Sequence, residues 1–141
     1  MTAPRIFTVR EAEATLPLVR PVVGDLLAAY PRWREHVARY EVLTGPLKSG
    51  DAEPEELRQT REAVTREAER INSYMLELER VGCVFKGFDA GLVDFYALKD
   101  DRLVFLCWKI DEEHITHWHE VDAGYAGRQP IDTDMFSETV A

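Results

Sequence analysis

The residues best suited to chemistry gather in one stretch, EEHITHWHEVDAGYAGR, which runs from Glu112 to Arg128. Three of the four histidines of the chain fall within six residues there, and carboxylates flank them: the members are His114, His117, His119, Glu112, Glu113, Glu120 and Asp122. Imidazole and carboxylate groups are ligands of divalent transition metals. The stretch indicates a candidate metal site, although a histidine-rich surface strand produces the same pattern.

Alternation along a strand decides which of these side chains can act together. If residues 113–121 are extended, His117 and His119 share one face, with imidazoles about 7 Å apart at about 3.3 Å per residue. Such a pair is a two-ligand start for Zn²⁺, Fe²⁺ or Mn²⁺. A third ligand must come from elsewhere, and Glu112 and Glu120 are the nearest carboxylates. The spacing alone is a weak signal, so a structural role for both histidines stays open.

A further carboxylate, Asp94, stands in an apolar segment. As part of a strand it shares its face with apolar or aromatic neighbours, namely Leu92, Tyr96 and Leu98. A buried, unpaired carboxylate is energetically costly, so we expect a metal, a histidine, Lys86 or Arg128 to pair with it. The alternative is a structural carboxylate satisfied by a backbone donor or by Arg128.

A long first helix is predicted before these segments. Thr8 and Glu11 have the spacing of a capping box. Apolar residues then follow at alternating intervals of four and three, typical of a helix lying along a partner helix: Ala12, Leu16, Val19, Val23, Leu26, Tyr30, Trp33, Val37 and Tyr40. Three prolines, Pro17, Pro21 and Pro31, interrupt the pattern. We therefore expect a short first helix, a kink near residues 16–21 and a long helix to about Leu43.

A second helix is predicted after the loop 44–51. It opens near Asp51 or Glu53, has Pro54 in its first turn and stops at Gly82. Its apolar positions continue the same spacing: Leu57, Val64, Ala68, Ile71, Met75 and Leu78. Two such helices joined by a short loop form an antiparallel hairpin.

After Gly82 the apolar period changes to two, which is typical of strands. The predicted strands are 83–88, 92–98, 102–110 and 114–121, followed by a loop over 123–128. The fold class is α+β: a long antiparallel helical hairpin, kinked by prolines, followed by a small antiparallel β-sheet. The chain is predicted to be a single domain over 1–141, with the hairpin at 1–82, the sheet and loop at 83–131, and an acidic, poorly ordered tail at 132–141.

Composition limits the classes of function. The net charge is −9, and residues 83–141 carry five Lys/Arg against twelve Asp/Glu, which disfavours nucleic-acid binding. The chain lacks a signal-peptide pattern and any apolar run long enough for a membrane, so a cytoplasmic protein is expected. Cys83 and Cys107 lie in apolar settings and are predicted to be buried thiols. A nucleophilic pairing of Cys107 with His119 is disfavoured, because a buried thiol stays protonated.

Several sequence blocks resemble one known family. They are FTVREA from Phe7 with Leu16-Pro17, GLVDF from Gly91, LCWK from Leu106, and WHE from Trp118 with GYAGRQP from Gly124. Together they make the chain similar to the DUF2203 family of small bacterial proteins of unassigned function. The resemblance covers nearly the whole chain. It implies that Glu112, Asp94 and His119 are the shared polar set, while His114 and His117 occupy variable positions.

Three readings of function follow. In the first, this is a small metal-binding protein whose site lies between the sheet and the hairpin, with His119, His117, Glu112, Asp94 and Glu120 as candidate ligands of a divalent transition metal (Zn, Fe or Mn). Whether it is an enzyme is left undecided. In the second, it is a non-enzymatic interaction or structural module whose hairpin forms a homodimer or binds a partner. A third, weaker reading places a small anionic ligand at Arg128 and the glycine-rich loop.

Overall fold

The computed structural model describes residues 4–132, so the tail beyond Asp132 lies outside the described residues. Its first element is one helix, α1 (Val9–Thr44). The predicted capping box is confirmed: the Thr8 hydroxyl accepts from the Glu11 N–H at 3.0 Å, and the Thr8 N–H donates to the Glu11 carboxylate at 2.9 Å. These two bonds satisfy donors that a helix start otherwise leaves unpaired.

The expected separate short helix is not present, because α1 continues through all three prolines. Each proline removes one backbone donor. Pro17, Pro21 and Pro31 are all exposed, so their rings do not disturb the packing of the buried face of the helix. The helix therefore tolerates the prolines without ending at them.

The second helix, α2 (Glu55–Val81), runs back along α1 and ends at Gly82, whose φ of 101° is left-handed. The predicted hairpin is thus confirmed. The buried face of α2 differs in part from the predicted one. Leu57 and Leu78 are buried as expected, but Met75 is 37 % exposed while Glu67 is buried. Arg32 and Arg70 lie 4.0 and 3.5 Å from the Glu67 carboxylate, which explains how a charged residue occupies that face.

Five strands form one antiparallel meander in the order β1-β2-β3-β4-β5. Their bounds are β1 (Val84–Gly87), β2 (Leu92–Lys99), β3 (Arg102–Lys109), β4 (His117–Glu120) and β5 (Gln129–Pro130), with a short 3₁₀ helix, η1 (Tyr125–Gly127), before β5. A two-residue turn joins β2 to β3. Asp100 and Asp101 occupy it with positive φ values of 52° and 61°, as the common hairpin turn requires.

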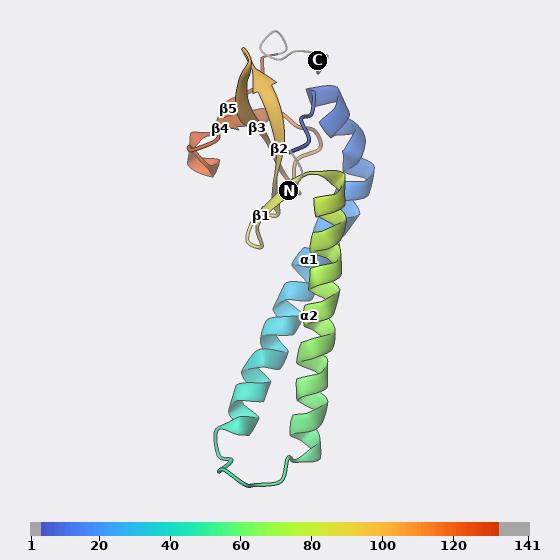
Figure 1. Ribbon diagram of the computed structural model, residues 1–141, viewed down its shortest axis with the longest axis vertical. Helices are drawn as coiled ribbons and strands as arrows, with labels where there is room; N and C mark the ends of the chain where they lie inside the picture. The colour runs from blue at the N-terminus through green and yellow to red at the C-terminus, as the bar shows by residue number, and fades with distance from the viewer. Residues whose placement is uncertain (1–3, 133–141) are drawn as a thin grey trace.

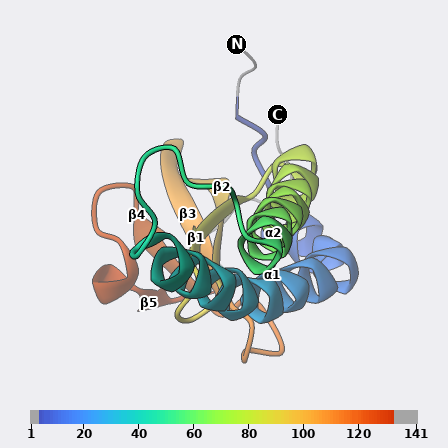
Figure 2. The same cartoon turned by 90° about the horizontal axis from the view of Figure 1, so that it is seen from below.

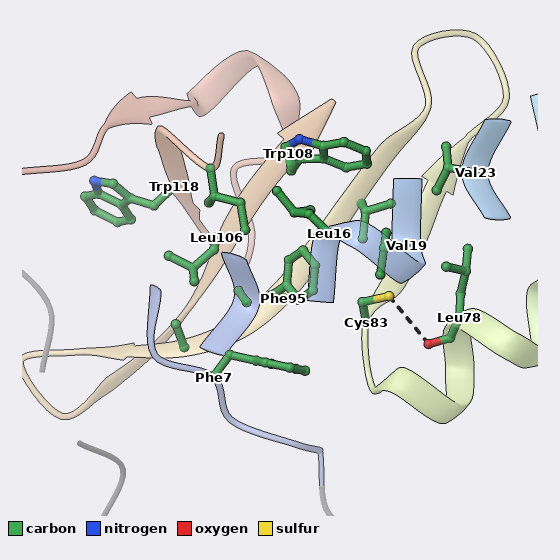
Figure 3. Packing of buried hydrophobic residues seen from close by; sticks show 14 of the residues in the cluster. Phe7, Leu16, Val19, Val23, Leu78, Cys83, Phe95, Leu106, Trp108 and Trp118 are labelled. Atoms are coloured by element: carbon green, nitrogen blue, oxygen red, sulfur yellow. Dashed lines mark hydrogen bonds between the residues drawn. The ribbon is translucent and has the colours of Figure 1, made fainter. Parts of the chain in front are cut away.

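One face of the sheet packs on the helices. Leu16, Val19 and Val23 of α1 point toward strand residues such as Phe95, Leu106 and Trp108 (Figure 3). The Phe7 ring packs edge-on against Phe95 at 5.1 Å. The Phe7 N–H donates to the carbonyl of Tyr96 at 2.7 Å. The segment before α1 therefore bonds to the edge of β2 beyond Asp94, where β1 no longer pairs with that strand. Trp108 and Trp118 both lie in the core, with 0 and 3 % exposure.

The hairpin is much longer than the sheet. Figure 1 shows the sheet beside one end of the hairpin, with both helices continuing past it toward the loop that joins them. Viewed along the hairpin, the helices lie together on one side and the strands on the other (Figure 2). Among the described residues, neither helix combines the length and apolar character needed to cross a membrane.

The fourth strand is shorter than predicted. Residues 111–116 form a loop, and β4 begins only at His117. Arg20 of α1 holds this loop through its guanidinium, which donates to the carbonyl oxygens of Ile110, Glu112 and Glu113 at 3.0–3.1 Å. These three hydrogen bonds from one guanidinium satisfy carbonyl groups that a longer strand would have paired with its neighbour.

Candidate functional site

Three side chains from three adjacent strands meet on the sheet face that points away from the helices. They are Asp94 of β2, Cys107 of β3 and His119 of β4, and all are buried. Asp94 is directly opposite Cys107, while His119 is opposite Phe105, two residues along the same strand. Because side chains alternate along a strand, this register places all three on one face. The cluster is therefore on the opposite face from the expected site between sheet and hairpin.

The two ring nitrogens of His119 have different partners. Nδ1 lies 2.7 Å from the backbone carbonyl oxygen of Glu120. A carbonyl can only accept, so Nδ1 carries a proton and donates it. Nε2 lies 3.1 and 3.2 Å from the two carboxylate oxygens of Asp94. In the neutral ring Nε2 presents a lone pair to this carboxylate, so a proton or a cation has to lie between the two acceptors.

The spacing of the three ligand atoms suits a small metal ion after a modest adjustment. The atoms offered by Asp94, Cys107 and His119 all lie within 4.8 Å of one another. Ligands about 2.0–2.3 Å from a tetrahedral ion are roughly 3.3–3.7 Å apart. The His119–Asp94 separation of 3.1–3.2 Å is just below this range, so small movements of the three side chains would bring the ligand atoms to these separations.

The Cys107 thiol is kept protonated in the absence of a cation. Burial raises its pKa to about 12, and the negative charge of Asp94 acts in the same direction. A metal ion reverses this effect, because thiolate coordination displaces the proton. The two predicted buried thiols are confirmed: Cys83 and Cys107 are both free and buried.

A cavity of about 240 Å³ opens beside the cluster. Its walls come from β1 to β4 and from the loop after β4; they are Lys86, Leu92, Asp94, Phe105, Cys107, His119, Val121, Gly124 and Tyr125. The cluster is therefore buried and yet borders a space that a small molecule can enter.

The structure places Glu112 beside Arg128 instead of beside Asp94. An Arg128 Nη2–H donates to Glu112 Oε1 at 2.6 Å and to the Cys107 carbonyl at 3.0 Å. The Lys109 N–H also donates to Glu112 Oε1, at 2.9 Å. Of the partners expected for Asp94, the structure shows the histidine, His119, while Arg128 pairs with Glu112. Arg128 is not part of the cavity wall. Its bond to the Cys107 carbonyl holds β3 at the position of Cys107.

The remaining predicted ligands lie apart from the cluster. His117 shares a face with His119, as expected, but it contacts the Thr116 hydroxyl at 2.9 Å and lies 3.7 Å from Glu112. Glu120 forms an ion pair with Arg102 at 2.6 Å. His114 is exposed and lies 3.3 Å from Glu13. Of the candidate ligands, Asp94 and His119 belong to the cluster, whereas His117 and Glu112 lie 3.7 Å apart outside it.

Cys107 is the member that the sequence interpretation missed as a ligand. Its strand reads as a continuous apolar run, which does not reveal which side chains face the helices. The two-residue turn at Asp100 and Asp101 contains the missing signal. It pairs Lys99 with Arg102, and the same register pairs Asp94 with Cys107. Counting back from the turn identifies the contact.

Comparison with known proteins agrees with the resemblance of the sequence blocks. The family model described as an uncharacterized conserved protein, DUF2203, matches residues 5–131. The chain belongs to the DUF2203 family. A search of curated proteins and a search of solved structures gave no match. The DUF2203 blocks GLVDF, LCW and WHE each contain one member of the cluster: Asp94, Cys107 and His119 respectively.

Proposed function

We propose that the protein binds one divalent transition metal ion through Asp94, Cys107 and His119. The arrangement of His119 is the observation that carries this proposal. Its Nδ1–H is held by the Glu120 carbonyl, and its Nε2 faces the Asp94 carboxylate. In metal sites a ligating histidine almost always donates its other ring N–H to a carbonyl or carboxylate, which fixes the tautomer.

The donor set narrows the choice of metal. A carboxylate oxygen, a thiolate sulfur and an imidazole nitrogen together suit Zn²⁺ and Fe²⁺, whereas Mn²⁺ prefers oxygen ligands. Zn²⁺ accepts three such ligands in a tetrahedral site and keeps the fourth position for water or another small ligand. A cation between Asp94 and His119 also removes the conflict between two acceptors that face each other. Zinc is therefore the ion we propose, with ferrous iron second.

Metal content of the purified, untagged protein tests the proposal. The protein is stripped with a chelator and dialysed against Zn²⁺ or Co²⁺, and bound metal is then measured by mass spectrometry. We expect about one equivalent in the wild-type chain and a loss of metal in His119→Ala and Cys107→Ser. Bound Co²⁺ should show a thiolate charge-transfer absorption that Cys107→Ser abolishes.

His117→Ala is the matched control. It removes an imidazole two residues away on the same strand and the same sheet face, but outside the cluster. We expect it to retain the metal. Wild-type protein that binds no metal after reconstitution, or His119→Ala that binds as much as wild type, would rule the site out.

An alternative function, a non-enzymatic interaction module, is favoured by the hairpin. Its helices continue past the sheet (Figure 1), and Val42 and Leu76 are 66 and 42 % exposed. A second copy packed along the helices would cover such residues and form a homodimer. Light scattering with chromatography checks this: a dimer that Val42→Glu with Leu76→Glu dissociates supports it, and a monomer at all concentrations contradicts it.

A further inference from the structure

The cavity beside Asp94, Cys107 and His119 has apolar walls and one basic residue. Leu92, Phe105 and Val121 contribute the aliphatic and aromatic surface, and Lys86 contributes the positive charge. The Lys86 ammonium lies 5.5 Å from the centre of the Phe105 ring. The Phe105 ring in turn lies 5.4 Å from the His119 ring. The charge therefore stands close to the cluster, across one aromatic side chain.

Lys86 has no carboxylate partner of its own among residues 4–132, since no ion pair of that segment includes it. On β1 and β2 its neighbours on this face are the apolar Val84 and Leu92, with Asp94 beyond them on the same cavity wall. The other basic residues near the cavity are engaged: Lys109 lies 3.7 Å from Asp111, and Arg128 pairs with Glu112. Lys86 is thus the charge available to a ligand that enters the cavity.

The cluster itself would be electrically balanced once a metal is bound. A divalent ion carries two positive charges, and the Asp94 carboxylate with the Cys107 thiolate carries two negative ones, while His119 is neutral. The three ligands all come from the sheet, so the fourth position of a tetrahedral ion faces away from the strands and into the cavity. The remaining charge in the cavity is the single positive charge of Lys86, which matches a monoanion.

We propose that this cavity binds a small monocarboxylate, an inference that rests on the proposed metal site. One carboxylate oxygen takes the open metal position and the other is directed to Lys86. The short apolar part packs on Phe105 and Leu92. The volume of about 240 Å³ is below the roughly 300–1,000 Å³ of pockets for drug-sized ligands, so the ligand is a short-chain carboxylate.

Butyrate is the probe, and Co²⁺-loaded full-length protein reports its binding through the visible spectrum. We expect butyrate to change the spectrum saturably, and butyramide, which has the same shape without charge, to leave it unchanged. Loss of a charge-assisted contact should weaken butyrate binding about tenfold in Lys86→Gln. Lys86→Arg, which keeps the charge, should retain most of the affinity.

Val121→Trp tests the cavity separately from the metal. Val121 is a 50 % exposed residue of the cavity wall and is not one of the three metal ligands. A larger side chain at this position therefore fills the cavity without changing the metal site. We expect full metal content and lost butyrate binding. Two outcomes would overturn the carboxylate site while leaving the metal site intact. One is a spectrum of the Co²⁺-loaded protein that does not change with butyrate, and the other is an equal affinity for butyrate in wild type, Lys86→Gln and Val121→Trp. Protein that retains no Co²⁺ would overturn both.

Discussion

The Nε2 atom of His119 lies 3.1 Å from the Oδ1 atom of Asp94, and each residue is only 2 % exposed. Removing one partner of a buried, hydrogen-bonded pair leaves the other without compensation. We expect Asp94→Asn to lower the free energy of unfolding of the metal-free protein by about 3 kcal/mol. Urea denaturation in the presence of a chelator measures it.

Asp89→Asn is the control for that substitution. Asp89 is exposed in the turn between β1 and β2, so its change should stay within about 0.5 kcal/mol. If Asp94→Asn proved as stable as this control, the Asp94–His119 pair would contribute nothing to the fold.

Stability at alkaline pH should depend on Cys107. Its pKa is about 12 in the folded chain against an ordinary value of 9.0, chiefly because of burial. Between these values the unfolded chain loses the thiol proton while the folded chain keeps it. The contribution is therefore fully present below pH 9 and is lost as pH rises toward 12, by at most about 1.4 kcal/mol per pH unit.

Urea denaturation of metal-free wild type, Cys107→Ala and Cys83→Ala at pH 8.0, 9.5 and 10.5 checks this dependence. The wild type should lose stability more steeply than either variant. Burial raises the pKa of Cys83 to about 11, so its effect should end at a lower pH than that of Cys107. Identical slopes in all three proteins would contradict the shifted thiols.

Arg20 should be essential for the loop that precedes β4. It donates to three carbonyls of that loop and lies 5.0 Å from the Trp108 ring. Arg20→Met removes all three of these bonds, although the Glu112 carbonyl keeps the Trp108 indole N–H at 2.9 Å, and we expect a loss of about 2–3 kcal/mol. Hydrogen exchange should accelerate over residues 111–116. Arg39→Met removes only an exposed ion pair with Glu56, so it should change stability by under about 1 kcal/mol; equal losses would refute the anchoring role.

Substitution of Gly82 and of Gly50 by alanine distinguishes the cost of backbone strain from the cost of a steric contact with Arg5. Both have left-handed φ values, +101° and +90°, but a Cβ at Gly82 would lie 3.0 Å from Arg5 Cβ, while nothing lies within 4 Å at Gly50. Alanine at Gly50 should cost about 1 kcal/mol from backbone strain alone. Alanine at Gly82 should cost roughly twice that and displace the entry segment. Thermal unfolding of both variants measures the difference, and equal shifts would argue against the Arg5 contact.

The sequence predicts the helices and strands of this protein better than it predicts the residues of the candidate site. The capping box at Thr8, the stop at Gly82 and the alternation in β2 are local signals, and each is confirmed. The partial error on α2 arose because Glu67 occupies the buried face with Arg32 and Arg70 beside its carboxylate, and the periodicity of apolar residues does not detect such a pairing. The three histidines drew attention to Glu112–Arg128, yet two of them lie outside the cluster. Proximity in sequence is a poor guide to a site assembled across three strands.

The course of the chain also has a consequence for synthesis on the ribosome. Every strand pairs with its neighbour in sequence, so the sheet can form in the order in which its strands emerge. The first half of α1 is different, because its partners on β3 and β4 are translated about ninety to a hundred residues later. We expect nascent chains halted once Gly82 has left the exit tunnel to protect the distal hairpin from protease but to leave the segment around Leu16 open to cleavage. Protection there should appear only once Trp118 has left the exit tunnel, which makes the candidate site and the final closure of the core a single late event.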